Sequence, residues 1–365
     1  MSGTVLVMAG GTGGHVFPAL AVAEALRARG VRIVWRGTRR GLEARVVPEA
    51  GIPLESISIA GLRGKTLLSR LAAPFRIAWA VFQALGIVAR VKPAAVLGMG
   101  GYAAGPGGIA AWLMRRPLVI HEQNAVAGVT NRLLSRFARR VLAAFPDAFG
   151  MGVKAEVVGN PVRPAIAELP PPEVRFARRS GPVRLLVLGG SQGALALNRA
   201  VPAALARLPA GSRPQVRHQA GKATVDQAEA AYREAGVEGD VVAFIDDMAE
   251  AYGWADLAVC RAGALTVSEL AAAGLGAVLV PFPAAVDDHQ TLNAGYLVGV
   301  GAAVIVPESG LDVHDFSRLL AGLLADRERL EDMARRAREA ARPEALADIE
   351  AACLEAGGLA AGEAA

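Results

Sequence analysis

The chain has 365 residues and a mass of 37.6 kDa, a length that suggests two domains of ordinary size. Hydrophobic residues make up 53% and charged residues 20%, which excludes an intrinsically disordered chain. The two cysteines are too few for a disulfide scaffold or a four-cysteine zinc site. The formal net charge of +5 at pH 7 favours anionic partners such as phosphates, nucleic acid or acidic lipid.

The sequence predicts no signal peptide and no membrane-spanning helix. The first residues, MSGTVLVMAGGTGGH, lack the basic region of a signal peptide. Two uncharged stretches, residues 94–114 and 270–286, approach the length of a span, but glycines and prolines interrupt both. We expect buried strand–loop–helix segments there, and a cytoplasmic protein.

A strand, a glycine turn and a helix open the chain. The strand is Val5–Met8, the turn is residues 10–14, and the helix extends from about Val16 to Arg29 with Pro18 in its first turn. The same order returns later: strand Val183–Leu188, turn 189–193, and a helix from Ala194 to about Leu208. The pattern predicts an α/β protein of two Rossmann-like domains, with parallel sheets flanked by helices.

Six prolines between residues 160 and 182 place the domain boundary there. The alternative is one large domain with a surface loop.

Three glycine-rich segments favour phosphate or nucleotide binding, because such turns expose backbone N–H groups at a helix start. They are residues 10–14, 98–108 and 189–193. A Walker A motif is absent, since Ile59 stands where its leading glycine would be. The dinucleotide fingerprint also fits poorly, because Val16 takes the place of its last glycine. ATP hydrolysis and hydride transfer are therefore disfavoured.

Polar residues follow two later strands. Glu269 lies in a segment that follows strand Leu257–Cys260 and opens a helix. Its carboxylate either caps the first helical turn or accepts hydrogen bonds from a ribose diol. Further on, residues 287–290 and Asn293 open another helix after strand Ala277–Val280. Ligands of parallel α/β proteins bind at such strand ends.

Eight blocks occur in order across nearly the whole chain: GGTGGHVFPALAVAEAL, GMGGYAAGPG, HEQNAVAGVTNR, GNPVR, GGSQGA, FIDDM, CRAGALTVSE and DHQTLNA. Together they resemble the MurG family of peptidoglycan N-acetylglucosaminyltransferases. The resemblance implies the GT-B fold, in which two Rossmann-like domains face each other across a cleft. It implies an acceptor-binding, membrane-facing domain at residues 1–162 and a donor-binding domain at 163–342. A helix at about 343–356 is expected to pack back on the first domain.

The family transfers N-acetylglucosamine from UDP-N-acetylglucosamine to the 4-hydroxyl of the muramyl unit of lipid I, with inversion, to give lipid II. The resemblance therefore implies that donor and an undecaprenyl-diphosphate-linked muramyl-pentapeptide as substrates. It implies no tightly bound metal or cofactor and no nucleic acid. It places the protein on the cytoplasmic face of the plasma membrane, as a peripheral protein on an anionic surface, with other cell-wall synthesis proteins as possible partners.

The resemblance also assigns site residues. Arg163 and Ser191 are expected near the diphosphate, and Glu269 at the ribose hydroxyls. Ile245 is expected to contact the uracil through its backbone. The residues expected to read the sugar hydroxyls are Asn124, Gln290 and Asp288. The other expected donor-binding residues are Thr12, Gly13, Gly14, Ala264, Leu265, Thr266, Val267 and Ser268. The acceptor-side residues are Gly101, Tyr102 and Asn131.

Two residues are candidates for the catalytic base. His15 follows the first glycine turn, and a histidine can take up a proton near neutral pH. The alternative is that His15 only caps or packs the helix start. Glu122 is the competing candidate; its alternative is a buried carboxylate that holds its loop by hydrogen bonds.

Residues 62–92 are predicted to dock on the membrane. From Phe75 onward the helical wheel is apolar nearly all round, with Trp79 beside a narrow strip formed by Arg76, Gln83 and Arg90. Further cations lie just before it: Arg63, Lys65 and Arg70. Apolar side chains ringed by cations suit anionic lipid. The alternative is an ordinary core helix.

Rival functions remain at the sequence level. They are another GT-B enzyme, such as a glycolipid glycosyltransferase or a UDP-N-acetylglucosamine 2-epimerase, and a noncatalytic sugar-nucleotide-binding subunit. An epimerase needs no lipid acceptor. The scattered basic residues form no recognisable nucleic-acid-reading motif.

Overall fold

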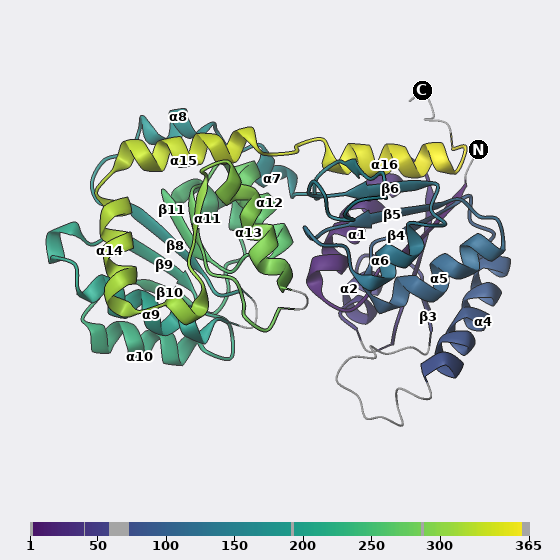
Figure 1. Ribbon diagram of the computed structural model, residues 1–365, viewed down its shortest axis with the longest axis horizontal. Helices are drawn as coiled ribbons and strands as arrows, with labels where there is room; N and C mark the ends of the chain where they lie inside the picture. Colours follow the sequence, from purple (N-terminus) through teal and green to yellow (C-terminus); the bar gives the residue numbers. More distant parts are fainter. Residues whose placement is uncertain (1–2, 40, 58–72, 191–192, 286–287, 360–365) are drawn as a thin grey trace. The chain divides into compact units, whose positions relative to one another are not determined.

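The computed structural model describes residues 3–39, 41–57, 73–190, 193–285 and 288–359. The chain divides into two compact units (Figure 1). The first comprises Met1–Pro161 and Pro343–Ala365, and the second comprises Val162–Arg342. The N-terminal unit thus includes the end of the chain, and each unit has its own sheet.

The first unit contains a seven-stranded parallel sheet in the order β3-β2-β1-β4-β5-β6-β7. Its strands are β1 (Thr4–Met8), β2 (Arg32–Gly37), β3 (Leu54–Ser56), β4 (Ala95–Gly98), β5 (Leu118–Glu122), β6 (Arg140–Ala143) and β7 (Glu156–Val157). Its described helices are α1 (Gly13–Ala28), α2 (Glu43–Glu49), α4 (Ala73–Val91), α5 (Gly101–Leu113), α6 (Val129–Leu134) and α16 (Ala345–Ala356).

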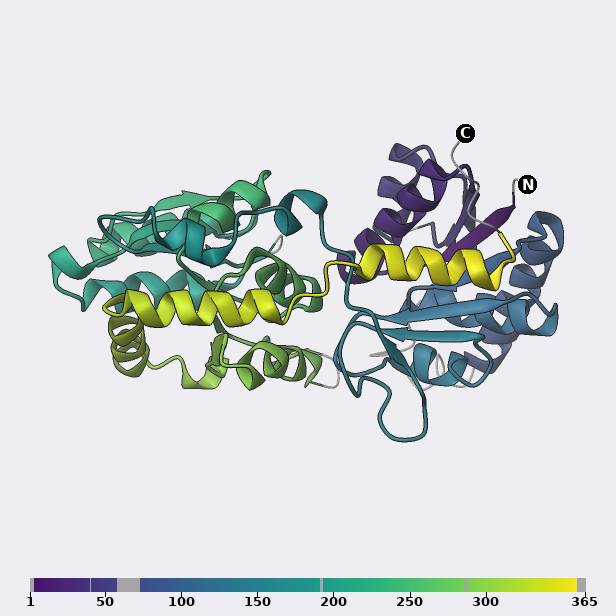
Figure 2. The ribbon, with the colours of Figure 1, turned by 90° about the horizontal axis from the view of Figure 1, so that it is seen from above.

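Both faces of this sheet are covered. On β1, Val5 and Val7 pack with residues of α1 and α16 in one core. Leu6 and Met8 alternate with them and pack with residues of α4 and α5 in a second core. A central strand buried on both faces explains the unbroken apolar run VLVM at Val5–Met8. Figure 2 shows α16 lying along this sheet, and the helix contacts α1 and strands β4, β5 and β6.

The second unit repeats the plan with a six-stranded parallel sheet in the order β10-β9-β8-β11-β12-β13. Its strands are β8 (Arg184–Leu188), β9 (Gln215–Gln219), β10 (Asp240–Val242), β11 (Leu257–Cys260), β12 (Ala277–Leu279) and β13 (Ala303–Ile305). Its longer helices are α9 (Leu195–Ala206), α10 (Val225–Ala235), α12 (Ala264–Ala273), α13 (His289–Gly299), α14 (Val313–Leu324) and α15 (Arg327–Glu339). Its described short α-helices are α7 (Pro164–Ala167), α8 (Pro172–Phe176) and α11 (Met248–Trp254), and single 3-10 turns lie at Ala210–Ser212 and Glu308–Gly310.

The predicted fold class is confirmed, and the element bounds differ by a few residues. The first helix begins at Gly13 rather than at Val16, because Gly13 and Gly14 already take helical geometry after the extended Thr12. The apolar stretch at residues 94–114 forms β4 and α5, as expected. The unit boundary lies between Pro161 and Val162, whereas the sequence places it one residue later.

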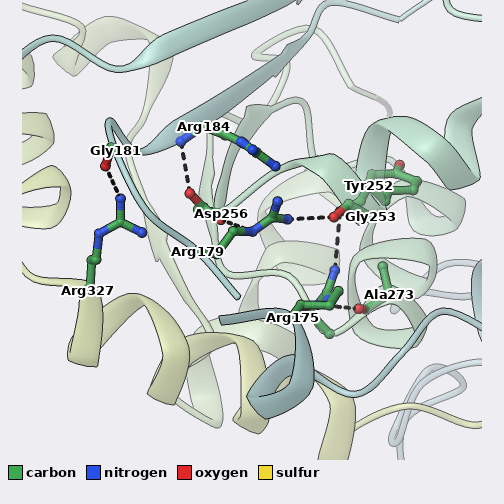
Figure 3. A network of polar contacts seen from close by, with 10 residues as sticks. Arg175, Arg179, Gly181, Arg184, Tyr252, Gly253, Asp256, Ala273 and Arg327 are labelled. Atoms are coloured by element: carbon green, nitrogen blue, oxygen red, sulfur yellow. Dashed lines mark hydrogen bonds and ion pairs between the residues drawn. The ribbon is translucent and has the colours of Figure 1, made fainter. Parts of the chain in front are cut away.

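A cluster of arginines holds the helices of the second unit together (Figure 3). The guanidinium of Arg175, on α8, donates to the carbonyls of Tyr252, Ala273 and Gly274 at the ends of α11 and α12. Burial, and then the neighbouring arginines Arg179 and Arg338, lower the pKa of Arg175 to about 10. The carbonyls at a helix C-terminus have no intrahelical partner, so one buried cation satisfies both helix ends.

Replacing Arg175 should therefore destabilise the second unit. We expect Arg175→Met to lower the free energy of unfolding by about 2 kcal/mol, because three buried carbonyls lose their donor. Urea unfolding measures the change, with the exposed Arg318→Met as the control. Equal stability of Arg175→Met and the wild type would show that water replaces the guanidinium at no cost.

Candidate functional site

Each sheet reverses its strand order at one point, and several of the predicted residues follow the strands beside those points. In the first unit the order reverses between β1 and β4, and in the second between β8 and β11. Loops that leave the carboxyl ends of strands diverge at such switch points and form ligand-binding crevices. The glycines at residues 10–14, 100–101 and 189–190 follow β1, β4 and β8. Each unit therefore carries its own set of candidate residues.

The first glycine turn lies on a buried carboxylate that sequence reasoning missed. Glu43, on α2, is fully buried. Its Oε2 accepts from the N–H of Gly11 at 3.1 Å, and its Oε1 accepts from the N–H and the hydroxyl of Thr38. A Cβ on Gly10 would lie 2.6 Å from Oε1, so the turn needs glycine there. The contact joins residues 32 positions apart, and no local pattern reveals it.

His15 lies in the first turn of α1, at the carboxyl end of β1. Its ring Nδ1 is 2.6 Å from Oε1 of Gln123, which directly follows β5. A Cβ on Gly100, after β4, would lie 3.2 Å from the His15 ring. Three neighbouring strand ends therefore meet at this half-buried imidazole, and the Gln123 contact holds the ring in place.

Glu122 has the geometry of a buried carboxylate that holds its loop by hydrogen bonds. Its side chain is buried and accepts four hydrogen bonds. The donors are the backbone and side-chain N–H groups of Asn124, the N–H of Gly128 and the side-chain amide of Asn131. A carboxylate occupied in this way holds the loop after β5 and has little room to take a substrate proton. The geometry therefore favours His15 as the base.

The expected acceptor-side residues have different surroundings. Gly101 has a φ of 75°, and a Cβ there would lie 2.4 Å from the carbonyl oxygen of Gly10, so only glycine fits. Tyr102 follows it in the first turn of α5 and is half-buried. Asn131 is buried, and its amide donates to Glu122 and to the carbonyl of His121. Asn131 therefore helps to hold the loop after β5 in place.

In the second unit, Glu269 lies in the second turn of α12. The helix begins at Ala264 and has no acidic residue in its first turn, so the capping alternative for Glu269 does not hold. Its Oε1 pairs with Nη2 of Arg163 at 2.9 Å, and its Oε2 accepts from the Tyr252 hydroxyl at 3.1 Å. The Glu269 side chain is 17% exposed, so the carboxylate is held on both oxygens and still open to a ligand.

Five of the other predicted donor residues, residues 264–268, lie on α12 itself. Thr266 and Leu265 are half-buried, whereas Ala264 and Val267 are buried. The hydroxyl of Ser268 donates to the carbonyl of Ala264.

Ile245 is half-buried in the loop after β10. Gln290 Oε1 accepts from the N–H of Phe282, and Asp288 accepts from Thr291. Thr12 precedes α1 and is exposed, as is Gly14, whereas Gly13 is half-buried. Ser191 lies outside the described residues.

Two family domains match the two units. Residues 5–143 match the glycosyltransferase family 28 N-terminal domain, and residues 184–349 match its C-terminal domain. The chain belongs to glycosyltransferase family 28. The predicted resemblance to the MurG family, and with it the assignment as a glycosyltransferase, is confirmed by relatives and by a solved structure.

Two relatives bear the name UDP-N-acetylglucosamine--N-acetylmuramyl-(pentapeptide) pyrophosphoryl-undecaprenol N-acetylglucosamine transferase. The chain is 61% identical over 355 residues to that of Alkalilimnicola ehrlichii, covering 97% of this chain and 99% of the relative. It is 59% identical over 353 residues to that of Chromohalobacter salexigens, covering 96% of each.

Solved structures agree with this family 28 assignment. The crystal structure of Acinetobacter baumannii MurG is similar with a TM-score of 0.86 and 42% identity, over 97% of this chain and 99% of that one. A UDP-GlcNAc 2-epimerase from Neisseria meningitidis is similar with a TM-score of 0.65 at 12% identity, over 96% of this chain and 99% of that one. The likeness to the epimerase shows the fold alone.

Proposed function

We propose that this chain transfers N-acetylglucosamine from UDP-N-acetylglucosamine to the 4-hydroxyl of the muramyl unit of lipid I, with inversion, giving lipid II. The observation that carries the proposal is the 61% identity, over nearly the whole chain, to a relative named for this transfer. The candidate residues at the two switch points provide the parts that the reaction needs.

The proposed reaction is a single in-line displacement. His15 takes the proton from the acceptor hydroxyl, whose oxygen forms a bond to C1 of the sugar. The bond from C1 to the diphosphate oxygen breaks, and UDP leaves with the electron pair. Positioning of the two substrates and stabilisation of the leaving charge lower the barrier. Backbone N–H groups at helix starts and the Arg163 guanidinium can supply that stabilisation, so we propose that no bound metal is needed.

A transfer assay tests the proposal. Purified protein is incubated with UDP-N-acetylglucosamine and a short-chain lipid I analogue, with and without EDTA, and products are identified by mass. We expect the disaccharide product at the same rate in both. Formation of UDP-N-acetylmannosamine without acceptor would favour the epimerase instead, and donor binding without transfer would favour another acceptor.

We further propose that α4 rests on an anionic membrane at the cytoplasmic face. Phe75, Trp79 and Phe82 on this helix are 80%, 56% and 65% exposed, whereas Ala80, Ala84 and Val88 pack in the core. Among the described residues, Pro74–Val91 is long and apolar enough to cross a membrane by length and composition, and 22% of it is buried. One face packed and one aromatic face exposed differ from a core helix and suit an interfacial helix. Arg63, Lys65 and Arg70 lie outside the described residues.

Removing the exposed aromatic side chains should release the protein from lipid. We expect the triple change Phe75→Ser, Trp79→Ser and Phe82→Ser to weaken binding to vesicles of anionic phospholipid at least about 10-fold, because each ring buries apolar area in the interface. Vesicle co-sedimentation measures the effect. Met151→Ser, at a fully exposed loop residue of the same unit, is the control. Unchanged binding of the triple variant would place the lipid-binding surface elsewhere.

A further inference from the structure

A series of hydrogen bonds connects His15 to buried residues in the interior of the first unit. Nδ1 of His15 lies 2.6 Å from Oε1 of Gln123, and Nε2 of Gln123 lies 3.0 Å from Nδ1 of His121. Nε2 of His121 lies 2.8 Å from the carbonyl oxygen of Gly159. Gln123 and His121 are 1% and 0% exposed, so water does not compete for these bonds.

The donor and the acceptor of each hydrogen bond can be assigned by starting from the carbonyl of Gly159. The carbonyl of Gly159 can only accept, so the proton of His121 is on Nε2. Burial lowers the pKa of His121 to about 4, against the opposing effects of the Gly159 bond and of Glu122, so the ring is neutral near pH 7. A neutral ring has one proton, and Nδ1 of His121 must therefore accept from Gln123.

The Gln123 amide cannot be turned round. Its Nε2 also donates to the carbonyl oxygen of His121 at 3.1 Å, so two acceptors face the amide nitrogen. A flipped amide would place its oxygen against both acceptors. Oε1 therefore faces His15 and accepts a hydrogen bond from Nδ1–H, which leaves the lone pair of a neutral His15 on Nε2.

We propose that Gln123, oriented by His121, is the positioning residue that fixes the tautomer of His15 and keeps Nε2 ready to accept a proton. Its importance for turnover rests on the proposed function, in which His15 is the base. A carboxylate commonly holds a catalytic imidazole in this way. A glutamine does so without adding a negative charge beside the ring. Glu122 and His15 are the ionisable groups that act electrostatically on His121.

Nitrogen NMR of the ¹⁵N-histidine-labelled full chain tests the tautomer directly. Two-bond proton–nitrogen spectra near pH 7, assigned with His15→Gln and His121→Gln, report which ring nitrogen has the proton. We expect Nδ1–H for His15 and Nε2–H for His121. A His15 ring with its proton on Nε2 would overturn the proposal. The spectrum does not depend on turnover, so it decides the proposal even if the wild type forms no lipid II.

Two substitutions test the consequence for catalysis. We expect Gln123→Leu to lower kcat at least about 30-fold with an unchanged Kd for UDP-N-acetylglucosamine, because the His15 tautomer is no longer fixed. Gln123→Glu retains an acceptor and adds a charge that favours the imidazolium. Its second oxygen replaces the donor to His121, so the decisive readout is the pH profile, whose acid limb should move to higher pH.

Gln227→Leu, at an exposed glutamine on α10, controls for the change of side chain. Wild-type kcat and an unchanged pH profile in both Gln123 variants would overturn the proposal. If Gln123→Leu does not fold, the pH profile of Gln123→Glu and the wild-type spectrum still decide it.

Discussion

His15→Ala should lower the turnover number at least about 100-fold while the affinity for UDP-N-acetylglucosamine stays nearly unchanged. The physical reason is that a positioned base contributes about 10²–10⁴-fold to such a reaction, and no other described side chain takes its place. Glu122, the rival base, is occupied by four hydrogen bonds from its own loop. Glu269 and Arg163, which are expected to bind the ribose and the diphosphate, belong to the other unit and are unchanged in this variant.

Steady-state kinetics and donor titration together check this result. His314→Ala, at an exposed histidine of α14, is the control and should keep wild-type kinetics. A His15→Ala enzyme that turns over at nearly the wild-type rate would remove this residue from the role of base. Loss of donor affinity in step with turnover would instead assign His15 to binding.

Glu269→Ala should raise the KM for UDP-N-acetylglucosamine about 100-fold. The carboxylate is expected to accept a hydrogen bond from each of two ribose hydroxyls. Each hydrogen bond to a charged group contributes about 1.5–3 kcal/mol to the binding free energy. Arg163 loses its partner in this variant, but it is 53% exposed, so water can solvate the guanidinium. Tyr252→Phe removes only the buried hydroxyl behind Oε2 and should raise KM about 5-fold.

The ribose itself supplies the control. Glu269→Ala should weaken UDP far more than 2′,3′-dideoxy-UDP, which has no diol to lose. Tyr232→Phe, at another buried tyrosine of the second unit, matches Tyr252→Phe and should leave KM unchanged. Equal losses for UDP and its dideoxy analogue would contradict a ribose-binding Glu269.

Burial also keeps the Tyr252 hydroxyl a donor. Burial first, and then the charge of Glu269, raise the pKa of Tyr252 well above its usual value, so the phenol keeps its proton at any pH the enzyme works at. The backbone carbonyl of Tyr252 accepts from Arg175 while its hydroxyl donates to Glu269. One residue thus links the arginine cluster at the end of α12 to the carboxylate in its second turn.

Much of this architecture could be predicted because its signals lie in residues that are close together in the sequence. The apolar runs of β1 and β8, each followed by a glycine turn and a helix, predict the two parallel sheets and their switch points. His15 could be selected because it follows β1 closely in sequence, and Glu269 because it follows β11. The bounds of helices were less predictable, and so Glu269 was placed one turn too early.

The supporting residues could not be predicted, because their contacts join distant parts of the chain. Gln123 reaches His15 across 108 positions, and Glu43 reaches Gly11 across 32. Each is a buried polar side chain whose hydrogen-bond partner is distant in the sequence and is brought close only by the fold. The exposure of the α4 aromatic side chains is also a tertiary property, since the same apolar wheel is typical of a core helix.

The anomeric configuration of the product tests the central claim most directly. The wild-type protein is incubated with UDP-N-acetylglucosamine and a short-chain lipid I analogue, and the new glycosidic bond is examined by proton NMR. The account predicts a β-1,4-linked N-acetylglucosamine, with the large anomeric coupling of a β linkage and one UDP released for each bond formed. An α linkage, or sugar released to water without transfer to the muramyl unit, would contradict it.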